Sequence, residues 1–528
     1  TPITISDNTV IRAKIFKANH IPSRTESRTY ITNTDHALPI VTLVSNPDNF
    51  FDVNQGLYVY GPEGNYDPYI LPFFGANFWN DWERDVHFSF YEPNGELGVA
   101  LDAGVKIFGN WSRGNDQRSM SIFARGRYGF SDIEYPIFPQ LDYDKFEAIV
   151  LRSSGNDWMR TNIKDVIATS LMDGSGIETQ AYRSSIVYLN GEYWGLYNIR
   201  EKVNEHFLDD KINVTKSEIN ILERNGEIVK GTNQTYNELI EFVTNNSLAN
   251  SANYDVVADQ VDIDNLIAYQ VAQIYLDNTD WPGNNIKFWN SPETKWRWIL
   301  YDTDFSFGRP WDAPPFYDND TLSFALYAFG PGWPNPPWST LLMRRLIENT
   351  EFKTQFINRF ADESNTRFKV DSVRQHVEQV AASVAPEIPQ HFEYWSRWEN
   401  RSVYWQNQFM LSTYDEWVAE VDKIKEFTDN RIPYLTNHFI NYFGIDGTHN
   451  LTLNINNTEA GSVQLNSLTL SDSSWQGEYF DNIPISIEAI ANEGYVFSHW
   501  DGVTGESSAA LTISMTADMT IQAVFIAQ

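Results

Sequence analysis

Apolar residues recur at helical spacing after Asp262, at Ile263, Leu266, Ile267, Val271 and Ile274. Asp262 can cap the start of this helix, and the polar, Gly-containing stretch 278–283 can end it. Two short runs of aromatic and β-branched residues follow at 286–290 and 295–300, and the S-P-E-T stretch between them favours a hairpin. The pattern therefore predicts a helix followed by a two-stranded hairpin.

Two acidic loops bracket this hairpin. Asp280–Asn285 reads D-W-P-G-N-N, and Tyr301–Gly308 reads Y-D-T-D-F-S-F-G. Protein kinases use this order of elements, because phosphoryl transfer needs a carboxylate that orients the acceptor and oxygen ligands that hold Mg²⁺ on the phosphates. The D-x-x-x-x-N spacing also arises by chance in a chain with 70 acidic residues, and Asp and Asn in loops often serve as turn residues. Spacing alone leaves both interpretations open.

Two further motifs precede these loops. They are L-R-S-S-G-N-D-W at Leu151–Trp158 and V-Y-L-N-G-E-Y-W-G-L-Y-N-I-R-E-K-V-N-E-H-F-L at Val187–Leu208. Together with the loops, they resemble the CotH family, the spore coat protein H kinases, over residues 38–444. The resemblance implies an α+β protein with a divergent two-lobed protein-kinase-like fold and a helical second lobe. It also implies transfer of phosphate from ATP, with Mg²⁺ or Mn²⁺, to Ser or Thr of secreted or cell-surface proteins.

The same resemblance assigns roles to the acidic loops. Asp280 would be the catalytic carboxylate, with Asn285 as its metal-binding companion and Asp304 as a further metal ligand. Asp302 is a weaker candidate metal ligand. It lies two residues before Asp304, and we expect both side chains to face the same side because alternate residues of a strand do so.

The cation that pairs with the phosphates is less certain. The segment Lys106–Arg127 resembles the first-lobe segment of the family, but Arg118 stands where a Lys is expected. A guanidinium differs from an ammonium in reach and shape, so several cations remain candidates: Arg118, Arg152, Arg200 and Lys202. We favour Lys202, which follows Glu201 in the matched R-E-K motif. Alternatively, Arg200, Glu201 and Lys202 form ordinary surface ion pairs.

The charge of the chain limits its partners. A formal net charge of −32 repels nucleic acid and anionic membrane surfaces, so we expect no nucleic-acid partner. The same field repels ATP, and a nucleotide site must therefore be locally basic or screened by divalent cations. The chain has no Cys, which excludes disulfides and thiol catalysis. No apolar run approaches the roughly 20 residues of a membrane span.

The two ends of the chain look like separable modules. Residues 1–35 resemble the β-strand tail of a chitobiase C-terminal-like module, residues 36–445 form the kinase-like part, and residues 446–528 resemble a divergent InlB-type bacterial repeat. We expect Trp500 of the repeat to anchor a small β core. The family and the end modules imply an extracellular or surface protein of bacterial type, with glycan or cell-wall contact through the β modules. Because the sequence starts at Thr1 without an initiator Met, we expect it to be trimmed from a larger precursor.

Between the second acidic loop and the repeat the chain looks mostly helical. Helical spacing covers Ser339–Phe360, Val370–Ala385 and Tyr414–Phe427. Two loops, Arg309–Phe316 and the Pro- and Trp-rich Gly330–Trp338, are expected beside the acidic loops as a substrate lip. A cluster of aromatic residues either packs in the core or forms a surface on which a sugar stacks. Its members are Tyr394, Trp395, Trp398, Tyr404 and Trp405.

Three hypotheses on function therefore compete. We favour a metal-dependent Ser/Thr protein kinase. The second is a non-catalytic surface or scaffold protein that binds glycans or protein partners, which the Arg at position 118 favours. The third is a metal-dependent phosphoesterase that uses the same carboxylates without an acceptor protein.

Overall fold

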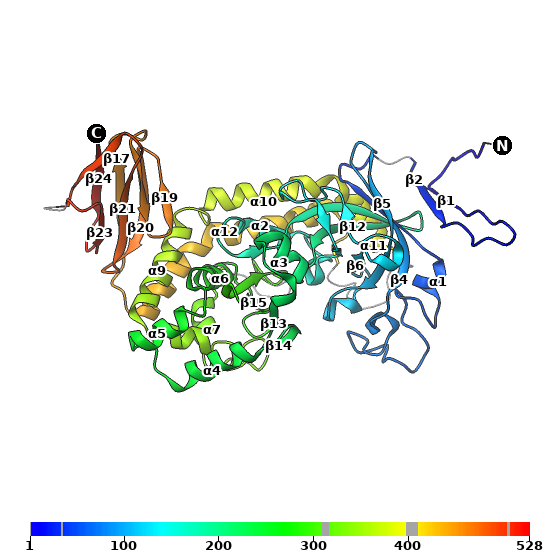
Figure 1. Ribbon diagram of the computed structural model, residues 1–528, viewed down its shortest axis with the longest axis horizontal. Helices are drawn as coiled ribbons and strands as arrows, with labels where there is room; N and C mark the ends of the chain where they lie inside the picture. The colour runs from blue at the N-terminus through cyan, green and yellow to red at the C-terminus, as the bar shows by residue number, and fades with distance from the viewer. Residues whose placement is uncertain (1, 33–34, 309–315, 398–409, 504–506) are drawn as a thin grey trace. The chain divides into compact units, whose positions relative to one another are not determined.

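The computed structural model describes residues 2–32, 35–308, 316–397, 410–503 and 507–528. Figure 1 shows the elements along the chain. The chain divides into two compact units. Unit 1 comprises Thr1–Ser170, Gln180–Ser217 and Val377–Lys423, and unit 2 comprises Leu171–Thr179, Glu218–His376 and Ile424–Gln528. Each unit is described by itself.

Unit 1 contains a closed β-barrel, which the sequence analysis did not predict. Its strand order is β11-β12-β9-β6-β5-β4-β3, and it closes where β11 and β3 pair in parallel. Alternate side chains of a strand fill the barrel, for example Val86, Phe88 and Phe90 of β4, which are at most 2% exposed. The barrel strands are β3 Ile40–Val44, β4 Arg84–Tyr91, β5 Leu97–Ile107, β6 Met120–Phe123, β9 Ala148–Arg152, β11 Tyr182–Leu189 and β12 Glu192–Glu201.

Shorter elements surround the barrel in unit 1. The predicted N-terminal strand is present as β1, which pairs antiparallel with β2. The other elements of this unit include β1 Thr9–Ala13, β2 Glu26–Tyr30, α1 Pro47–Phe51, β7 Ile133–Glu134, β8 Lys145–Phe146, α2 Lys164–Leu171, α3 Glu205–Ile212 and α11 Ile388–Ser396. α2 reaches one residue into unit 2, while α10 Val370–Val384 and α12 Tyr414–Phe443 contribute residues to both units.

Unit 2 contains the predicted helix and hairpin. Helix α6 spans Ile263–Tyr275, and the Asp262 carboxylate caps it by accepting a hydrogen bond from the backbone N–H of Asn265 at 3.0 Å. Strands β15 and β16 form the hairpin within a sheet of order β10-β16-β15-β13-β14. The bounds are β10 Glu178–Thr179, β13 Asn220–Glu223, β14 Glu227–Lys230, α4 Gln234–Asn245, α5 Ser251–Ala258, β15 Lys287–Ser291, β16 Thr294–Leu300 and α7 Thr321–Leu326.

The helices that follow differ partly from the prediction. A single helix over 339–360 is wrong, because the chain forms α8 Leu341–Leu346 and α9 Thr350–Ser364. Asn349 separates them by capping α9, where its side chain accepts hydrogen bonds from the N–H groups of Glu351 and Phe352. Helix α10 agrees with its prediction, and α12 continues well past Phe427 with Pro433 inside it.

A buried arginine fastens the end of α6 in unit 2. Arg431 of α12 is fully buried and donates to the carbonyls of Tyr275, Tyr317, Asn319 and Ile274 and to the Thr321 hydroxyl, at 2.8 to 3.1 Å. Its burial lowers the pKa of the guanidinium, and Asp277 at 3.9 Å opposes that shift. The carbonyls at the helix end thereby gain partners that the helix itself cannot supply.

The C-terminal part of the chain is all β, as predicted. Two sheets of order β20-β17-β24-β22 and β19-β18-β21-β23 form it. Trp500 is 3% exposed and donates its ring N–H to the carbonyl of Ser508, which confirms its role as a core residue. The strands are β17 Thr448–Ile455, β18 Gly461–Leu465, β19 Leu468–Leu470, β20 Ser474–Phe480, β21 Ile485–Ala491, β22 Tyr495–Asp501, β23 Ala510–Ile513 and β24 Met519–Ala527.

This β module packs on helix α9. Asp362 of α9 is fully buried, and its carboxylate accepts hydrogen bonds from the Tyr479 hydroxyl at 2.7 Å and from the N–H and hydroxyl of Ser467 at 3.0 and 2.6 Å. The ring of Phe439 stacks on that of Phe360 at 4.1 Å and lies 5.9 Å from that of Phe480. A carboxylate inside this apolar contact fixes the register of the two parts.

In the described part of the chain, no helix is both long enough and apolar enough to cross a membrane.

Candidate active site

The first acidic loop is tied to the end of helix α6. Asn278 donates its amide to the side-chain oxygen of Gln273 at 2.9 Å, and the Asp280 N–H donates to the Asn278 side chain at 3.2 Å. The second acidic loop returns to the same place, because the Phe307 N–H donates to the carbonyl of Leu276 at 2.9 Å. One helix end therefore positions both loops.

Asn285 joins the two loops directly. Its side-chain amide donates to the Asp280 carboxylate at 2.8 Å and to the backbone carbonyl of Asp302 at 3.1 Å. Asn284 donates to the other carboxylate oxygen of Asp280 at 3.0 Å. Because both N–H groups of the Asn285 amide are engaged, its carbonyl oxygen is the atom that it can offer to a cation. The structure thus brings Asp280, Asn285 and Asp302 together.

The backbone at this junction is unusual. Asn285 and Asp302 have φ angles of 47° and 54°, in the left-handed region that Asn and Asp tolerate better than most residues. Strand β16 ends at Leu300, so Asp302 and Asp304 lie in a loop. The expectation that they face the same side of a strand is wrong for that reason. Asp304 is buried and Asp302 is half-buried.

A lysine near these loops was missed by the sequence analysis. Lys287 begins strand β15, and its ammonium lies 3.8 Å from the Glu223 carboxylate and 5.0 Å from the centre of the Tyr301 ring. Burial lowers the pKa of Lys287, and the charges of Glu223 and Asp302 oppose this shift. The only sequence signal was a Lys in a strand run, two positions after Asn285.

The oxygen donors of the two loops suit a magnesium ion that is shared with a substrate. In the parts of the chain that the structure describes, no three His, Asp or Glu side chains are grouped closely enough to hold a metal by themselves. Magnesium commonly takes one or two protein carboxylates and completes its shell with phosphate oxygens and water. The carboxylate of Asp304 and the amide oxygen of Asn285 are donors of that kind, and Asp302 adds a further carboxylate in the same loop.

The Pro- and Trp-rich loop Gly330–Trp338 lies beside the acidic loops, as predicted. The Gly283 N–H donates to the carbonyl of Pro334 at 2.6 Å, and a Cβ atom at position 283 would stand 2.2 Å from the ring of Pro336. The rings of Trp333 and Phe305 are 6.5 Å apart, edge to face. The other predicted lip, Arg309–Phe316, falls outside the described residues except for Phe316.

The candidate cations belong to unit 1, and Arg118 is enclosed there. It is 3% exposed, and its guanidinium lies 4.0 Å from the centre of the Phe78 ring and 4.9 Å from that of Tyr58. Its Nε donates to the carbonyl of Arg113 at 2.8 Å. These contacts give Arg118 a packing role and do not support it as the phosphate-pairing cation.

Arg152 and Arg200 share one carboxylate. The Nε of Arg152 is 3.3 Å from Oδ2 of Asp165, and Arg200 donates to the same oxygen and to the Thr169 hydroxyl. Arg200 is 1% exposed, and burial lowers the pKa of its guanidinium despite Asp165. The alternative of surface ion pairs is therefore wrong for Arg200.

Glu201 is also buried, at 2% exposure, but its lysine partner is Lys211 at 3.0 Å. The carboxylate further accepts from the Ala181 N–H at 2.7 Å and from the Tyr143 hydroxyl. Lys202 is half-buried, with its ammonium 5.3 Å from the centre of the Phe108 ring and 5.5 Å from that of Phe123. Lys202 and Arg152 are half-buried, whereas Arg118 and Arg200 are buried.

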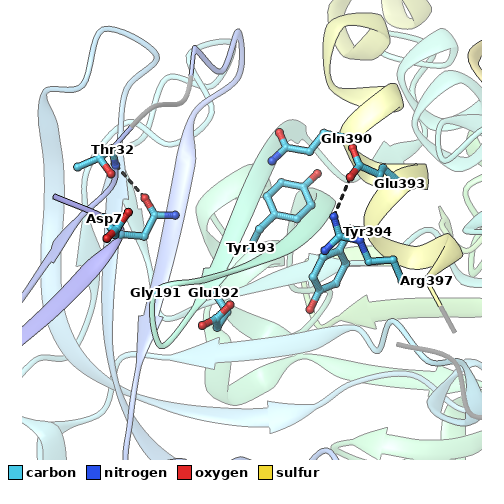
Figure 2. Close-up of a pocket in the computed structure, with 10 residues that line it drawn as sticks. Asp7, Thr32, Gly191, Glu192, Tyr193, Gln390, Glu393, Tyr394 and Arg397 are labelled. Carbon is cyan, nitrogen blue, oxygen red and sulfur yellow. Dashed lines mark hydrogen bonds and ion pairs between the residues drawn. The ribbon is translucent and has the colours of Figure 1, made fainter. Parts of the chain in front are cut away.

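The predicted aromatic cluster is partly a core seam. Trp395 is 2% exposed and packs edge to face on Trp158 and Trp194. Tyr394 contacts Tyr193 beside a pocket of about 500 Å³, where Figure 2 shows both rings near Gln390 and the Glu393–Arg397 pair. The remaining members, Trp398, Tyr404 and Trp405, lie outside the described residues.

Two family models match the chain. The family model described as CotH kinase protein matches residues 105–435, which is more than half of the chain. A second model, described as Divergent InlB B-repeat domain, matches residues 451–528. No curated protein matches the chain. The chain therefore belongs to the CotH kinase protein family and carries a divergent InlB B-repeat domain at residues 451–528.

Proposed function

We propose that this protein transfers the γ-phosphoryl group of ATP to Ser or Thr residues of extracellular or surface proteins. The observation that carries the proposal is the amide of Asn285, which holds the Asp280 carboxylate and the loop of Asp302 and Asp304 together. Family membership supports a kinase-like activity. The surface repeat supports an exported setting. A two-lobed kinase-like arrangement with a helical second lobe is part of the same proposal.

The chemistry assigns a separate task to each side chain. Asp280 orients the acceptor hydroxyl and receives its proton as the oxygen attacks the γ-phosphorus, while the bond from that phosphorus to the ADP oxygen breaks. Asn284 and Asn285 hold both oxygens of the Asp280 carboxylate in place. Asn285 and Asp304 would hold Mg²⁺, with Asp302 as the weaker ligand. When bound, the metal neutralises charge on the phosphates.

Labelled ATP tests this proposal. Wild-type protein is incubated with Mg²⁺ or Mn²⁺ and Ser/Thr-rich secreted proteins, beside the variants Asp280→Asn and Asp304→Asn. Each variant should lower transfer about a thousandfold, because it removes a group on which positioning and charge neutralisation depend. Asp255→Asn, at an exposed position of α5, is the matched control and should keep wild-type activity. Equal label on the wild type and both loop variants would reject the kinase.

One observation favours a second candidate function. The enclosed guanidinium of Arg118 leaves the family's first-lobe segment without an accessible cation at that position. A non-catalytic surface protein would tolerate this change. The melting temperature of a non-catalytic protein would not rise when ATP and metal are added, whereas that of a kinase should rise because bound nucleotide stabilises the folded state. Hydrolysis of a simple phosphate ester without any acceptor protein would instead identify the phosphoesterase.

A further inference from the structure

A groove runs along helix α9 where the β module packs on it. One cavity of about 710 Å³ is lined by residues of α6, α9 and the β module, and a neighbouring cavity of about 440 Å³ shares Thr354, Gln355 and Pro484 with it. Both cavities belong to unit 2. The two cavities are therefore neighbours along α9, and each has a volume in the range of sites that hold small organic ligands.

Two buried polar atoms in the wall of the groove lack hydrogen-bond partners among the described residues. They are Oδ1 of Asn358 and the hydroxyl oxygen of Ser175, whose residues are 4% and 7% exposed. The amide nitrogen of Asn358 is engaged, because it donates to the carbonyl of Pro484 at 2.7 Å. Buried polar atoms without partners are rare and costly, so the groove has hydrogen-bonding capacity that a ligand can use.

The charged groups of the groove are largely engaged within the protein. Four donors already occupy the Asp362 carboxylate, including the Asn466 amide at 3.3 Å. Arg359 is held by Glu363 at 2.9 Å and by the Ser175 carbonyl at 2.7 Å. Asp264 at the rim is one exposed carboxylate. Glu351 is a second exposed carboxylate of the lining, and an anion would therefore find no uncommitted cation there.

Hydroxyl and amide side chains make up most of the remaining lining. Thr354 and Gln355 of α9 line the groove together with Gln464, Ser486 and Thr512 of the β module. Hydroxyls and amides both donate and accept, and they match a ligand whose own groups do the same without net charge. From this chemistry we infer that the groove binds a neutral oligosaccharide, which gives the glycan contact expected for the β module a definite place.

A peptide is the less favoured occupant. An extended peptide would pair its backbone with a free strand edge, and β23 is the edge strand of its sheet in the described fold. Thr512 is the one residue of β23 among those that line the larger cavity, so little of that strand edge lies in the groove. The proposal is independent of phosphoryl transfer, and its test needs no nucleotide.

Titration calorimetry with soluble tetrasaccharides tests the inference on the full chain. The probes are N-acetylchitotetraose, cellotetraose and maltotetraose at millimolar concentration, and sedimentation with insoluble chitin and purified peptidoglycan shows whether a free sugar or a wall polymer is the source. We expect at least one probe to bind. Thr354→Val with Gln355→Leu should weaken binding about tenfold, because two hydrogen-bonding groups are lost.

A second variant and a matched control keep the result decisive. Ser486→Trp fills the groove from an exposed position of β21 and should abolish binding, with the melting temperature unchanged. Gln390→Leu makes the same amide-to-apolar change in the pocket of Figure 2 and should bind like the wild type. The inference is overturned if no probe binds, if the groove variants bind normally, if Gln390→Leu loses binding, or if a Gly/Ser peptide competes better than the sugars.

Discussion

Asn285 combines a backbone role with a side-chain role at the centre of the candidate site. Its left-handed φ of 47° turns the chain between the D-W-P-G-N-N loop and strand β15, and its amide joins the two acidic loops. Among the common residues, Asn and Gly accept this conformation most easily, but only Asn also supplies the amide. Two substitutions can separate the roles.

We expect Asn285→Gly and Asn285→Ala to lose phosphoryl transfer equally, since both remove the amide. Asn285→Ala should unfold more easily than Asn285→Gly by about 1 kcal/mol, because a Cβ is strained at this φ. Urea denaturation measures the difference in the free energy of unfolding, and labelled ATP measures transfer. Wild-type activity in Asn285→Gly would remove the residue from the site, and equal stability of the variants would refute the backbone role.

Arg431 stabilises the fold through the hydrogen bonds of its buried guanidinium. Its replacement by Met leaves the carbonyls of Tyr275 and Ile274 and the Asp277 carboxylate with fewer partners in a buried place. We expect Arg431→Met to lower the free energy of unfolding by about 3–5 kcal/mol. Arg374→Ala breaks an ion pair with Asp429 whose side chains are 36% and 42% exposed, and it should change stability by less than about 0.5 kcal/mol. Similar losses in both variants would contradict this account.

At the scale of elements, His391 links helix α11 to barrel strand β12. It is fully buried, and its Nδ1 accepts a hydrogen bond from the Leu196 N–H at 3.1 Å. Burial lowers the pKa of His391 from 6.5 to about 3. The imidazole is therefore neutral in the folded state across the physiological range.

This pKa shift predicts acid sensitivity of unit 1. The pKa of His391 is lower in the folded than in the unfolded state, so the unfolded chain takes up a proton first as the pH falls. The contribution of neutral His391 to the free energy of unfolding is therefore complete above pH 6.5 and is lost as the pH falls towards 3. At pH 5 the loss should be about 2 kcal/mol. Denaturant titrations between pH 5 and 8 should show this slope in the wild type and a flatter one in His391→Gln. Parallel slopes would show that His391 is not the sensor.

Elements set by local pattern were the predictable part of the fold. Helix α6 and the β15–β16 hairpin follow from a capping Asp262 and two short strand runs, all within 40 residues of sequence. The break between α8 and α9 was missed because apolar spacing continues through it, although Asn349 is a good capping residue. The barrel was missed because its closure pairs β3 with β11, far apart in the chain, and no local pattern encodes that contact.

The candidate site likewise has a part that the sequence predicts and a part that it does not. Asp280, Asn285 and Asp302 were found because neighbouring loops on one hairpin must lie close together. Contacts with more distant residues were not predicted, and one of them is the contact of the Glu201 carboxylate with Lys211. The enclosure of Arg118 by Phe78 and Tyr58 likewise depends on a loop 40 to 60 positions earlier in the chain.

At the scale of the whole molecule, the net charge of −32 sets the response to salt. At low ionic strength the field of the protein opposes the approach of ATP. Raising the ionic strength from about 0.01 to 0.15 M shortens the screening length from about 30 to 8 Å and should lower the KM for ATP several-fold at saturating Mg²⁺. Binding of uncharged adenosine is the control and should not change. A KM for ATP that rises with salt would contradict the prediction.

The packing of the β module on α9 has a consequence for evolution. Ser467 and Tyr479 of the repeat donate hydrogen bonds to a buried carboxylate on helix α9, outside the repeat. Replacement of the repeat by an unrelated copy would leave that carboxylate without these hydrogen-bond donors and would expose phenylalanine rings that are stacked at the contact. The two parts must therefore be inherited together, and substitutions at one side of the seam should be matched by substitutions at the other.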